Sequence, residues 1–155
     1  MPLQEVAKPE KPSREFPTQP LLGVGGVVID RGRVLLIRRG REPLKGEWSI
    51  PGGLLELGES LTDAVRRELK EETCLDVEPL ECLLAFDRIA TEEGRVKYHY
   101  VILDYVCRRQ GGRLRAASDA VDARWVRRED LAQYHLTELA TEVIGKAFEK
   151  MSQQR

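Results

Sequence analysis

Apolar residues follow two different periods along this chain, and the changes of period outline its secondary structure. Two apolar runs, 21–29 and 34–37, flank a short polar turn, which predicts a β-hairpin. Residues 80–89 and 96–107 are also rich in β-forming side chains and flank residues 92–94, so they predict a second hairpin. The strand at 96–107 is apolar on both faces, as expected of a central strand covered from both sides.

A helical period replaces the alternation in two places. Residues 61–73 are predicted to form a helix, because Ser60 is suited to cap it and Asp63 follows three residues later, as in a capping box. Residues 136–148 carry apolar side chains at helical spacing and predict a second helix packed on a sheet. Two short strands complete the pattern, at residues 48–50 and 122–126.

The length allows one compact domain preceded by an irregular arm. A chain of 155 residues, 41% of them hydrophobic, can bury one core but is too short for two ordinary domains. Residues 1–19 carry prolines among charged side chains and predict a flexible arm, which leaves residues 20–155 as the folded domain. Such an arm would suit a homodimer in which it clasps the partner.

Charge and cysteine content narrow the range of partners. The 25 basic and 26 acidic residues nearly cancel, so neither a nucleic acid polymer nor a membrane is expected as a partner. No apolar run approaches the roughly 20 residues that span a bilayer, and no secretory segment opens the chain, which predicts a cytoplasmic protein. Cys74, Cys82 and Cys107 lack metal-type spacing and are expected to be reduced, buried packing residues.

The helix predicted at 61–73 carries carboxylates where its apolar stripe continues. At about 100° per residue, Glu68, Glu71 and Glu72 fall within one arc of roughly 100°, near the arc of the apolar residues in the earlier turns. A solvated acidic surface is the ordinary interpretation of such a helix. Carboxylates pressed together on an inward face repel one another, however, and a hard divalent cation such as Mg²⁺ or Mn²⁺ would neutralise them. The pattern therefore favours a metal site.

Arg67 lies beside this acidic cluster, and Glu59 precedes the helix. Arg67 is either an ordinary surface arginine or the partner of Glu59 in an orienting ion pair, and the spacing favours the ion pair.

These residues together resemble the Nudix box, G-x5-E-x7-R-E-U-x-E-E-x-G-U. The matching residues are Gly53, Glu59, Arg67-Glu68-Leu69, Glu71-Glu72 and Leu75. One position departs: Cys74 stands where the family has the glycine of a left-handed turn after the helix. A cysteine there should cost up to about 1 kcal/mol of local stability. It removes no catalytic atom.

The resemblance extends from about residue 21 to residue 148 and implies an α/β fold, an α/β/α sandwich around a mixed β-sheet. It implies Mg²⁺ or Mn²⁺ as the cofactor. The implied metal ligands are Glu68, Glu71, Glu72 and the backbone carbonyl of Gly52. The implied catalytic residues are Glu68, Glu71, Arg67 and Glu59.

The sequence offers more than one candidate for the general base. Glu68 is one candidate, and the family often uses a further acid from a later loop. In this chain Glu92, Glu93 and Asp119 are the nearest acids, while the position five before Trp125, acidic in some relatives, is Ala120.

Substrate contacts are less specific. The resemblance implies a substrate-binding set of Arg38, Arg39, Trp48 and Gly53. The two arginines either hold phosphate or lie on the surface, and Trp48 either stacks on a base or packs in the core.

The substrate implied is a small nucleotide. The segment from Gly94 to Tyr100 is similar to bacterial Nudix proteins classed with ADP-ribose pyrophosphatases, so the expected reaction converts ADP-ribose and water into AMP and ribose 5-phosphate. One alternative is a diphosphatase that releases pyrophosphate from oxidised nucleoside triphosphates. Another is a nucleotide sensor without catalysis, although sensors usually lose carboxylates that this chain retains.

Overall fold

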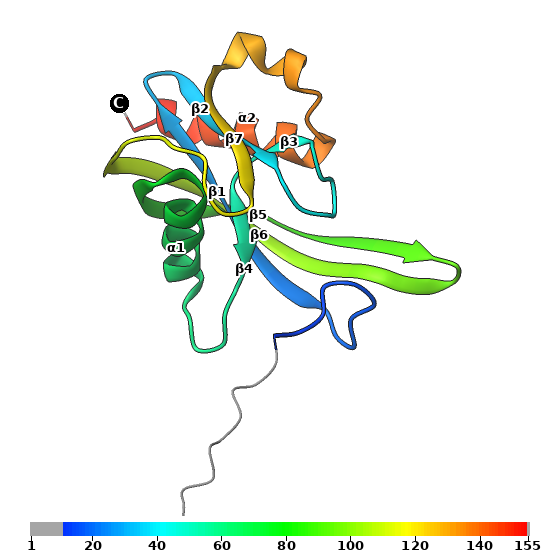
Figure 1. The fold of residues 1–155 in the computed structure, drawn as a ribbon. Coiled ribbons are helices and arrows are strands. Elements are labelled where there is room, and N and C mark those ends of the chain that lie inside the picture. Colours follow the sequence, from blue (N-terminus) through cyan, green and yellow to red (C-terminus); the bar gives the residue numbers. More distant parts are fainter. Residues whose placement is uncertain (1–10, 155) are drawn as a thin grey trace, which may run out of the picture.

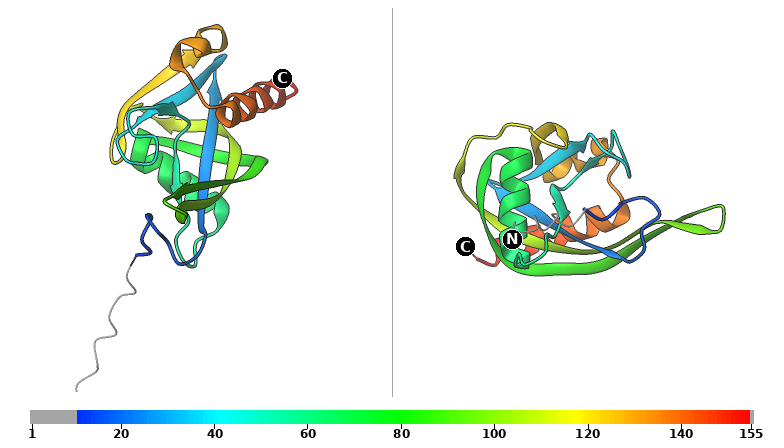
Figure 2. Two further views of the ribbon diagram at one scale, coloured as in Figure 1. Left: turned by 90° about the vertical axis from the view of Figure 1, so that its right-hand side faces the viewer. Right: turned by 60° about the horizontal axis from the view of Figure 1, so that its bottom comes forward.

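Two helices cover opposite faces of one mixed β-sheet (Figures 1 and 2). The structure is a computed structural model that describes residues 11–154, so the first part of the predicted arm, residues 1–10, lies outside the described residues. The helices are α1, Leu61–Thr73, and α2, Glu138–Ser152. In residues 11–154, neither helix has the length and apolar character that crossing a bilayer requires.

Seven strands form the sheet, in the order β3-β2-β1-β6-β5, with β4 added to β1 and β7 added to β2. Strands β1 and β6 pair in parallel, and the other pairings among the described strands are antiparallel. The bounds are β1 Leu21–Asp30, β2 Arg33–Arg39, β3 Trp48–Ser49, β4 Gly52–Leu54, β5 Leu75–Glu92, β6 Arg95–Gly112 and β7 Ala120–Arg127.

The first predicted hairpin is confirmed, but β1 and β2 pair directly only beside their turn, at Ile29 with Val34 and Asp30 with Arg33. Beyond these pairs the strands diverge. β1 continues along β6 on one side and β4 on the other, whereas β2 continues along β3 and β7. The carboxyl end of β2, at Arg39, is therefore separated from β1.

Strand β1 packs on both of its faces. Val24 and Val28 lie in the apolar cluster under α1, whereas Val27 and Ile29 lie in the cluster under α2. All four side chains are almost fully buried, which removes about 25 cal/mol of unfavourable hydration for each Å² of apolar surface. A sheet with an apolar core on each face is the predicted α/β/α sandwich, which is thus confirmed.

The second predicted hairpin is present but longer than predicted. β5 begins at Leu75, directly after the helix, and β6 continues to Gly112. Register shifts near Pro79 and at Cys82 interrupt the alternation of β5, so its amino-terminal part does not show a simple strand pattern. A short 3-10 helix, Arg128–Tyr134, was not predicted.

The cysteines are free, as predicted, but their burial differs. Cys107 is buried and Cys74 is half-buried, whereas Cys82 is exposed. The prediction of three buried cysteines is therefore wrong for Cys82. The reason is its place at an irregular position of β5, which is the outermost strand of its side of the sheet.

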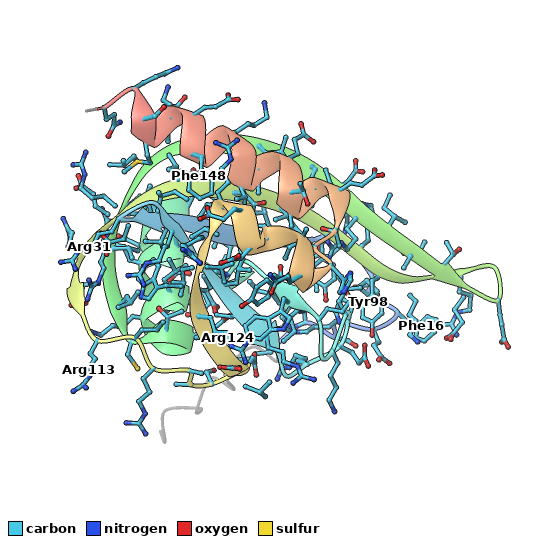
Figure 3. The ribbon with its side chains drawn as sticks, turned by 90° about the horizontal axis from the view of Figure 1, so that it is seen from above. Phe16, Arg31, Tyr98, Arg113, Arg124 and Phe148 are labelled. Atoms are coloured by element: carbon cyan, nitrogen blue, oxygen red, sulfur yellow. The ribbon has the colours of Figure 1, made fainter. Side chains whose placement is uncertain are left out.

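The described part of the predicted arm lies beside the start of β6. The backbone N–H of Phe16 donates to the carbonyl oxygen of Lys97 at 2.8 Å, and Figure 3 shows Phe16 and Tyr98 on the same side of the molecule.

Candidate active site

Helix α1 begins and ends where the sequence predicts. The Ser60 side chain accepts a hydrogen bond from the backbone N–H of Asp63 at 3.1 Å, which satisfies one of the free donors of the first turn. Val65, Leu69 and Glu72 are buried on the face that meets the sheet. Glu72 is buried because it follows these two apolar residues at helical spacing.

Arg67 holds the loop before the helix against the helix itself. Its Nε and Nη2 atoms donate to the two carboxylate oxygens of Glu59 at 2.7 and 2.9 Å, so the predicted ion pair is confirmed. The same guanidinium donates to the carbonyl oxygen of Leu54 at 3.0 Å and to Glu68 at 2.8 Å. The hydrogen bond from Arg67 lowers the pKa of Glu59. One side chain therefore connects the end of β4, the loop and the acidic face of α1.

Glu72 and Glu68 form the buried part of the acidic cluster. Glu72 is only 4% exposed, and burial, together with repulsion from Glu68, raises its pKa to about 8. Burial also raises the pKa of Glu68, while its hydrogen bond and ion pair with Arg67 oppose that shift. A positive charge close to both carboxylates would stabilise their ionised forms.

Glu71 differs from the other two carboxylates. Its side chain is 47% exposed and lies 3.4 Å from Arg67, one helical turn earlier. The expectation of a shared half-buried face thus holds for Glu68 and Glu72, whereas Glu71 lies exposed.

The donor set suits a hard divalent cation in its chemistry, although its side chains do not converge. Within residues 11–154 no three acidic, histidine or cysteine side chains are gathered closely enough to hold a metal ion. Glu72, however, is a buried carboxylate that makes no ion pair in the described part of the chain. Oxygen ligands with unbalanced negative charge fit Mg²⁺ or Mn²⁺ better than a soft metal.

Two glycines allow β4 to lie directly against this acidic face. A side chain at Gly53 would collide with the Glu68 carboxylate, and one at Gly52 would collide with the backbone of β1. A backbone hydrogen bond from Gly52 favours the ionised form of Glu72. The structure therefore brings both predicted glycines to the carboxylates.

Of the predicted side chains for substrate binding, Arg39 faces the cluster. Its charge interacts with that of Glu72, and burial lowers the pKa of Arg39. Arg38, the next residue on the strand, is exposed and donates to the carbonyl oxygen of Gly46. Trp48 packs edge-on against Tyr134, with ring centres 5.1 Å apart, so it lies half-buried against the core under α2.

The acids considered as general base lie at different distances from the acidic cluster. Glu92 and Glu93 are exposed at the β5–β6 turn, where Glu92 pairs with Lys97 at 3.3 Å. Asp119 lies close enough to Glu72 to raise its pKa. Ala120, which contributes no acid, is the first residue of β7 and is buried.

Sequence reasoning did not single out Asp104, a buried acid on the inner face of the sheet. Asp104 on β6 is 4% exposed, and burial raises its pKa to about 7. The hydroxyl of Tyr100, on the same face of β6, is buried without a hydrogen-bond partner in the described residues. The available signal was one acidic residue inside the apolar segment 101–107.

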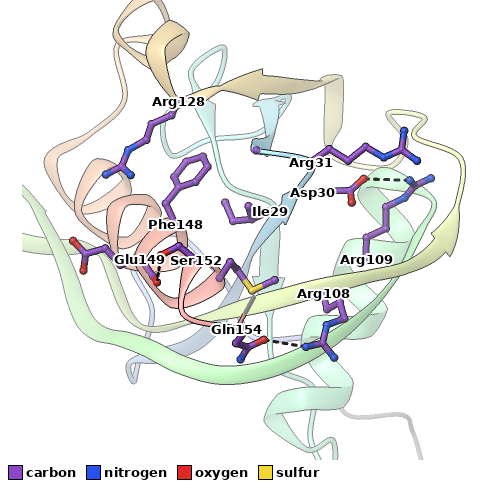
Figure 4. A pocket seen from close by; sticks show the side chains of 12 residues that line it. Ile29, Asp30, Arg31, Arg108, Arg109, Arg128, Phe148, Glu149, Ser152 and Gln154 are labelled. Atoms are coloured by element: carbon purple, nitrogen blue, oxygen red, sulfur yellow. Dashed lines mark hydrogen bonds and ion pairs between the residues drawn. The ribbon is translucent and has the colours of Figure 1, made fainter.

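A cavity of about 500 Å³ lies elsewhere, between the β1–β2 turn, β6 and the end of α2 (Figure 4). Arg128 packs over Phe148 there, and Arg109 pairs with Asp30 at 3.4 Å. None of the predicted site residues lines this cavity, so it is separate from the acidic cluster.

The fold and the acidic helix define a class of α/β/α proteins. Their carboxylates lie on the helix that follows a glycine-containing strand, which is β4 in this chain. Residues 19–147 match the family described as NUDIX domain, so the chain belongs to the Nudix family.

Relatives and solved structures agree with this assignment. The chain is 34% identical over 104 residues to an ADP-ribose pyrophosphatase of Methanocaldococcus jannaschii, across 67% of this chain and 60% of that protein. It is 33% identical over 129 residues to the human 8-oxo-dGDP phosphatase NUDT18, across 76% of this chain and 38% of that protein. The chain thus spans less than two thirds of the length of either relative.

Among solved structures, the MutT NUDIX hydrolase of Burkholderia pseudomallei superposes with a TM-score of 0.70 at 31% identity, covering 82% of this chain and 97% of that one. The NUDIX domain of Shewanella oneidensis NrtR, solved with ADP ribose, has the same fold, with a TM-score of 0.68 at 24% identity over 86% and 90% of the two chains.

Proposed function

We propose that this chain is a Mg²⁺-dependent pyrophosphohydrolase that cleaves the diphosphate of a nucleoside diphosphate derivative, with ADP-ribose as its substrate. The observation that carries the proposal is the pair of repelling carboxylates, Glu68 and Glu72, half-enclosed between α1 and the backbone of β4. Relatives named for ADP-ribose and for 8-oxo-dGDP support a nucleotide diphosphate as the substrate.

The reaction adds water to one phosphorus atom and breaks its bond to the bridging oxygen. ADP-ribose and water then give AMP and ribose 5-phosphate, and two protons are released when both monoester products are fully ionised. A divalent cation would have to draw Glu68, Glu71, Glu72 and the carbonyl of Gly52 together. It would withdraw charge from the phosphates and lower the pKa of a bound water.

The chain's own residues position the reactants. Arg67 fixes both Glu59 and Glu68, so it keeps the loop and the acidic face in register. Arg39, whose charge interacts with that of Glu72, binds a phosphate oxygen, and Gly53 lets the Glu68 carboxylate lie directly against β4. Either Glu68 or Asp119 takes the proton from water, and of the candidate loop acids the electrostatic contact with Glu72 favours Asp119.

A comparison of two glutamine variants tests this proposal. Glu72→Gln should lower the Mg²⁺-dependent release of AMP from ADP-ribose by about 100-fold or more, because it removes one ligand charge. It should also weaken Mn²⁺ binding measured by electron paramagnetic resonance. Glu142→Gln, at an exposed position of α2, is the matched control and should change neither quantity.

A second candidate, favoured by the likeness to an 8-oxo-dGDP phosphatase, is hydrolysis of oxidised purine nucleotides. The same assay with 8-oxo-dGDP and 8-oxo-dGTP separates the substrates by their products, phosphate or pyrophosphate in place of AMP. If none of these phosphoanhydrides is cleaved with Mg²⁺ or Mn²⁺, the enzymatic proposal is refuted.

A further inference from the structure

Residues 13–17, hereafter the amino-terminal segment, are fastened to the start of β6 by consecutive contacts. Tyr98 donates its hydroxyl hydrogen to Glu15 Oε1 at 3.0 Å, and the backbone N–H of Phe16 donates to the carbonyl of Lys97 at 2.8 Å. The guanidinium of Arg95 lies 4.4 Å from the centre of the Phe16 ring. A positive φ of 46° at Phe16 bends the chain there. These contacts position the segment independently of the helices.

A continuous set of contacts connects this segment to the acidic cluster. Tyr98 stacks near Tyr100, with ring centres 6.2 Å apart, in an apolar cluster that also contains Leu54. Leu54 ends β4, and its carbonyl oxygen accepts the hydrogen bond from Arg67. The amino-terminal segment is therefore two side chains away from the residue that orients Glu59 and Glu68.

Arg14 is the unexplained residue of the segment. It is half-buried, yet it takes part in no side-chain hydrogen bond or ion pair within residues 11–154. Its positive charge attracts that of Glu68 and repels that of Arg39, so Arg14 lies within electrostatic range of both residues. Arg88 of β5 acts on Arg39 in the same way.

Arg14 and Arg88 therefore both lie within electrostatic range of Arg39, while Arg39 interacts with Glu72 and Arg14 interacts with Glu68. Tyr100 pairs with Arg88 across β5 and β6. The buried hydroxyl of Tyr100 has no hydrogen-bond partner in the described part of the chain. Neighbouring guanidinium groups repel one another, so a dianionic group between them would stabilise all three. A nucleotide diphosphate has that charge.

We propose that the amino-terminal segment forms one wall of the active site and that Arg14 binds a phosphate of the substrate. The inference rests on the proposed function, because it assigns Arg14 to the diphosphate that the carboxylates would process. Glu15 and Phe16 are positioning residues in this arrangement, since they hold Arg14 in place through Tyr98 and Lys97.

Kinetics of the full chain test the role of Arg14. Arg14→Gln should raise the KM for ADP-ribose by about 10- to 100-fold, the range expected for one lost charge-assisted contact, with a much smaller change in kcat. Arg14→Lys should recover part of the loss. Arg113→Gln, at an exposed arginine on the loop before β7, is the control and should leave KM unchanged.

The hydrogen bond between Tyr98 and Glu15 gives a second, independent comparison. Tyr98→Phe removes only the hydroxyl that binds Glu15, so KM should rise by a smaller factor than in Arg14→Gln. In the Arg14→Gln background the same change should have little further effect, because both act through one side chain. Additive effects of the two substitutions, or an unchanged KM in Arg14→Gln, would overturn the inference.

Proteolysis separates this inference from the proposed function. Trypsin does not cleave before proline, so Lys8-Pro9 and Lys11-Pro12 resist it and Arg14-Glu15 is the first susceptible bond. Inorganic pyrophosphate with Mg²⁺ should slow cleavage after Arg14 about 10-fold or more relative to cleavage after Arg113 in the same digest. Protection without turnover of ADP-ribose would refute the proposed substrate alone. Turnover of ADP-ribose without protection of the Arg14-Glu15 bond would refute the inference that the amino-terminal segment lines the active site.

Discussion

Cys74 has the left-handed backbone conformation, which glycine adopts with less strain than any residue that carries a Cβ. Its φ and ψ are 61° and 13°, and its N–H donates to the carbonyl oxygen of Lys70 at 3.0 Å, so it closes α1 in the left-handed turn that the box motif predicts. The departure from the motif therefore changes the residue and leaves the turn in place.

Replacing this cysteine by glycine should stabilise the protein. Cys74→Gly should raise the free energy of unfolding by up to about 1 kcal/mol, because glycine has no Cβ to strain at positive φ. Urea denaturation measures the difference. Cys74→Ala keeps a Cβ and should gain nothing, so equal stability of the glycine and alanine variants would contradict this explanation.

Asp104 should make stability depend on pH. Burial raises its folded pKa to about 7 from an ordinary value of 3.8, so the fold favours the neutral carboxyl. Its contribution is complete below pH 4 and is lost as the pH rises through 7. Asp104→Asn, which stays neutral, should therefore be more stable than the natural chain at pH 8, by on the order of 2–4 kcal/mol.

The comparison is made by thermal or urea unfolding between pH 4 and pH 8. The stability difference between Asp104→Asn and the natural chain should shrink toward pH 4. Asp87→Asn, at an exposed position of β5, serves as the control and should show no such trend. A difference that is independent of pH would exclude Asp104 as its source.

At the scale of elements, α1 and the loop before it behave as one unit because of Arg67. Arg67→Lys keeps the charge but cannot make the two parallel hydrogen bonds to Glu59. Amide hydrogen exchange in residues 55–60 should become faster, and hydrolysis should slow by about 10-fold or more. Arg66→Lys is the matched control, since Arg66 faces solvent and, among residues 11–154, pairs only with Asp63.

Unchanged exchange in residues 55–60 of Arg67→Lys would mean that the loop is ordered by other contacts. A loss of activity in Arg66→Lys of similar size would point to a general effect on the helix instead of the ion pair.

The sequence predicted elements best where their signals are local. Helix α1 was predicted with its bounds, because the Ser60 cap and the apolar spacing both lie within it. The beginning of β5 was not, because irregular pairing around Pro79 conceals its period. Within the candidate site, the box residues were found by their spacing, whereas Asp104 and Arg14 could not be: their significance depends on strands and segments that meet only in three dimensions.

The whole molecule shows the same division. The two helices and two hairpins followed from the pattern of the chain. The parallel pairing of β1 with β6 did not, because residues 21–28 pair with residues 100–107, which are 79 positions away in the sequence. No local rule selects that partner, and without it the side chains of β6 cannot be assigned to the face that carries the carboxylates.

That pairing also affects how the protein can be made in a cell. The parallel neighbour of strand β1, Tyr100–Cys107, is synthesised roughly eighty residues after β1 itself. During that interval the nascent chain exposes a long apolar strand with an unpaired edge, which favours aggregation. Translation must therefore proceed past β6 before the central sheet can close, and chaperones that shield extended apolar segments would act within that window.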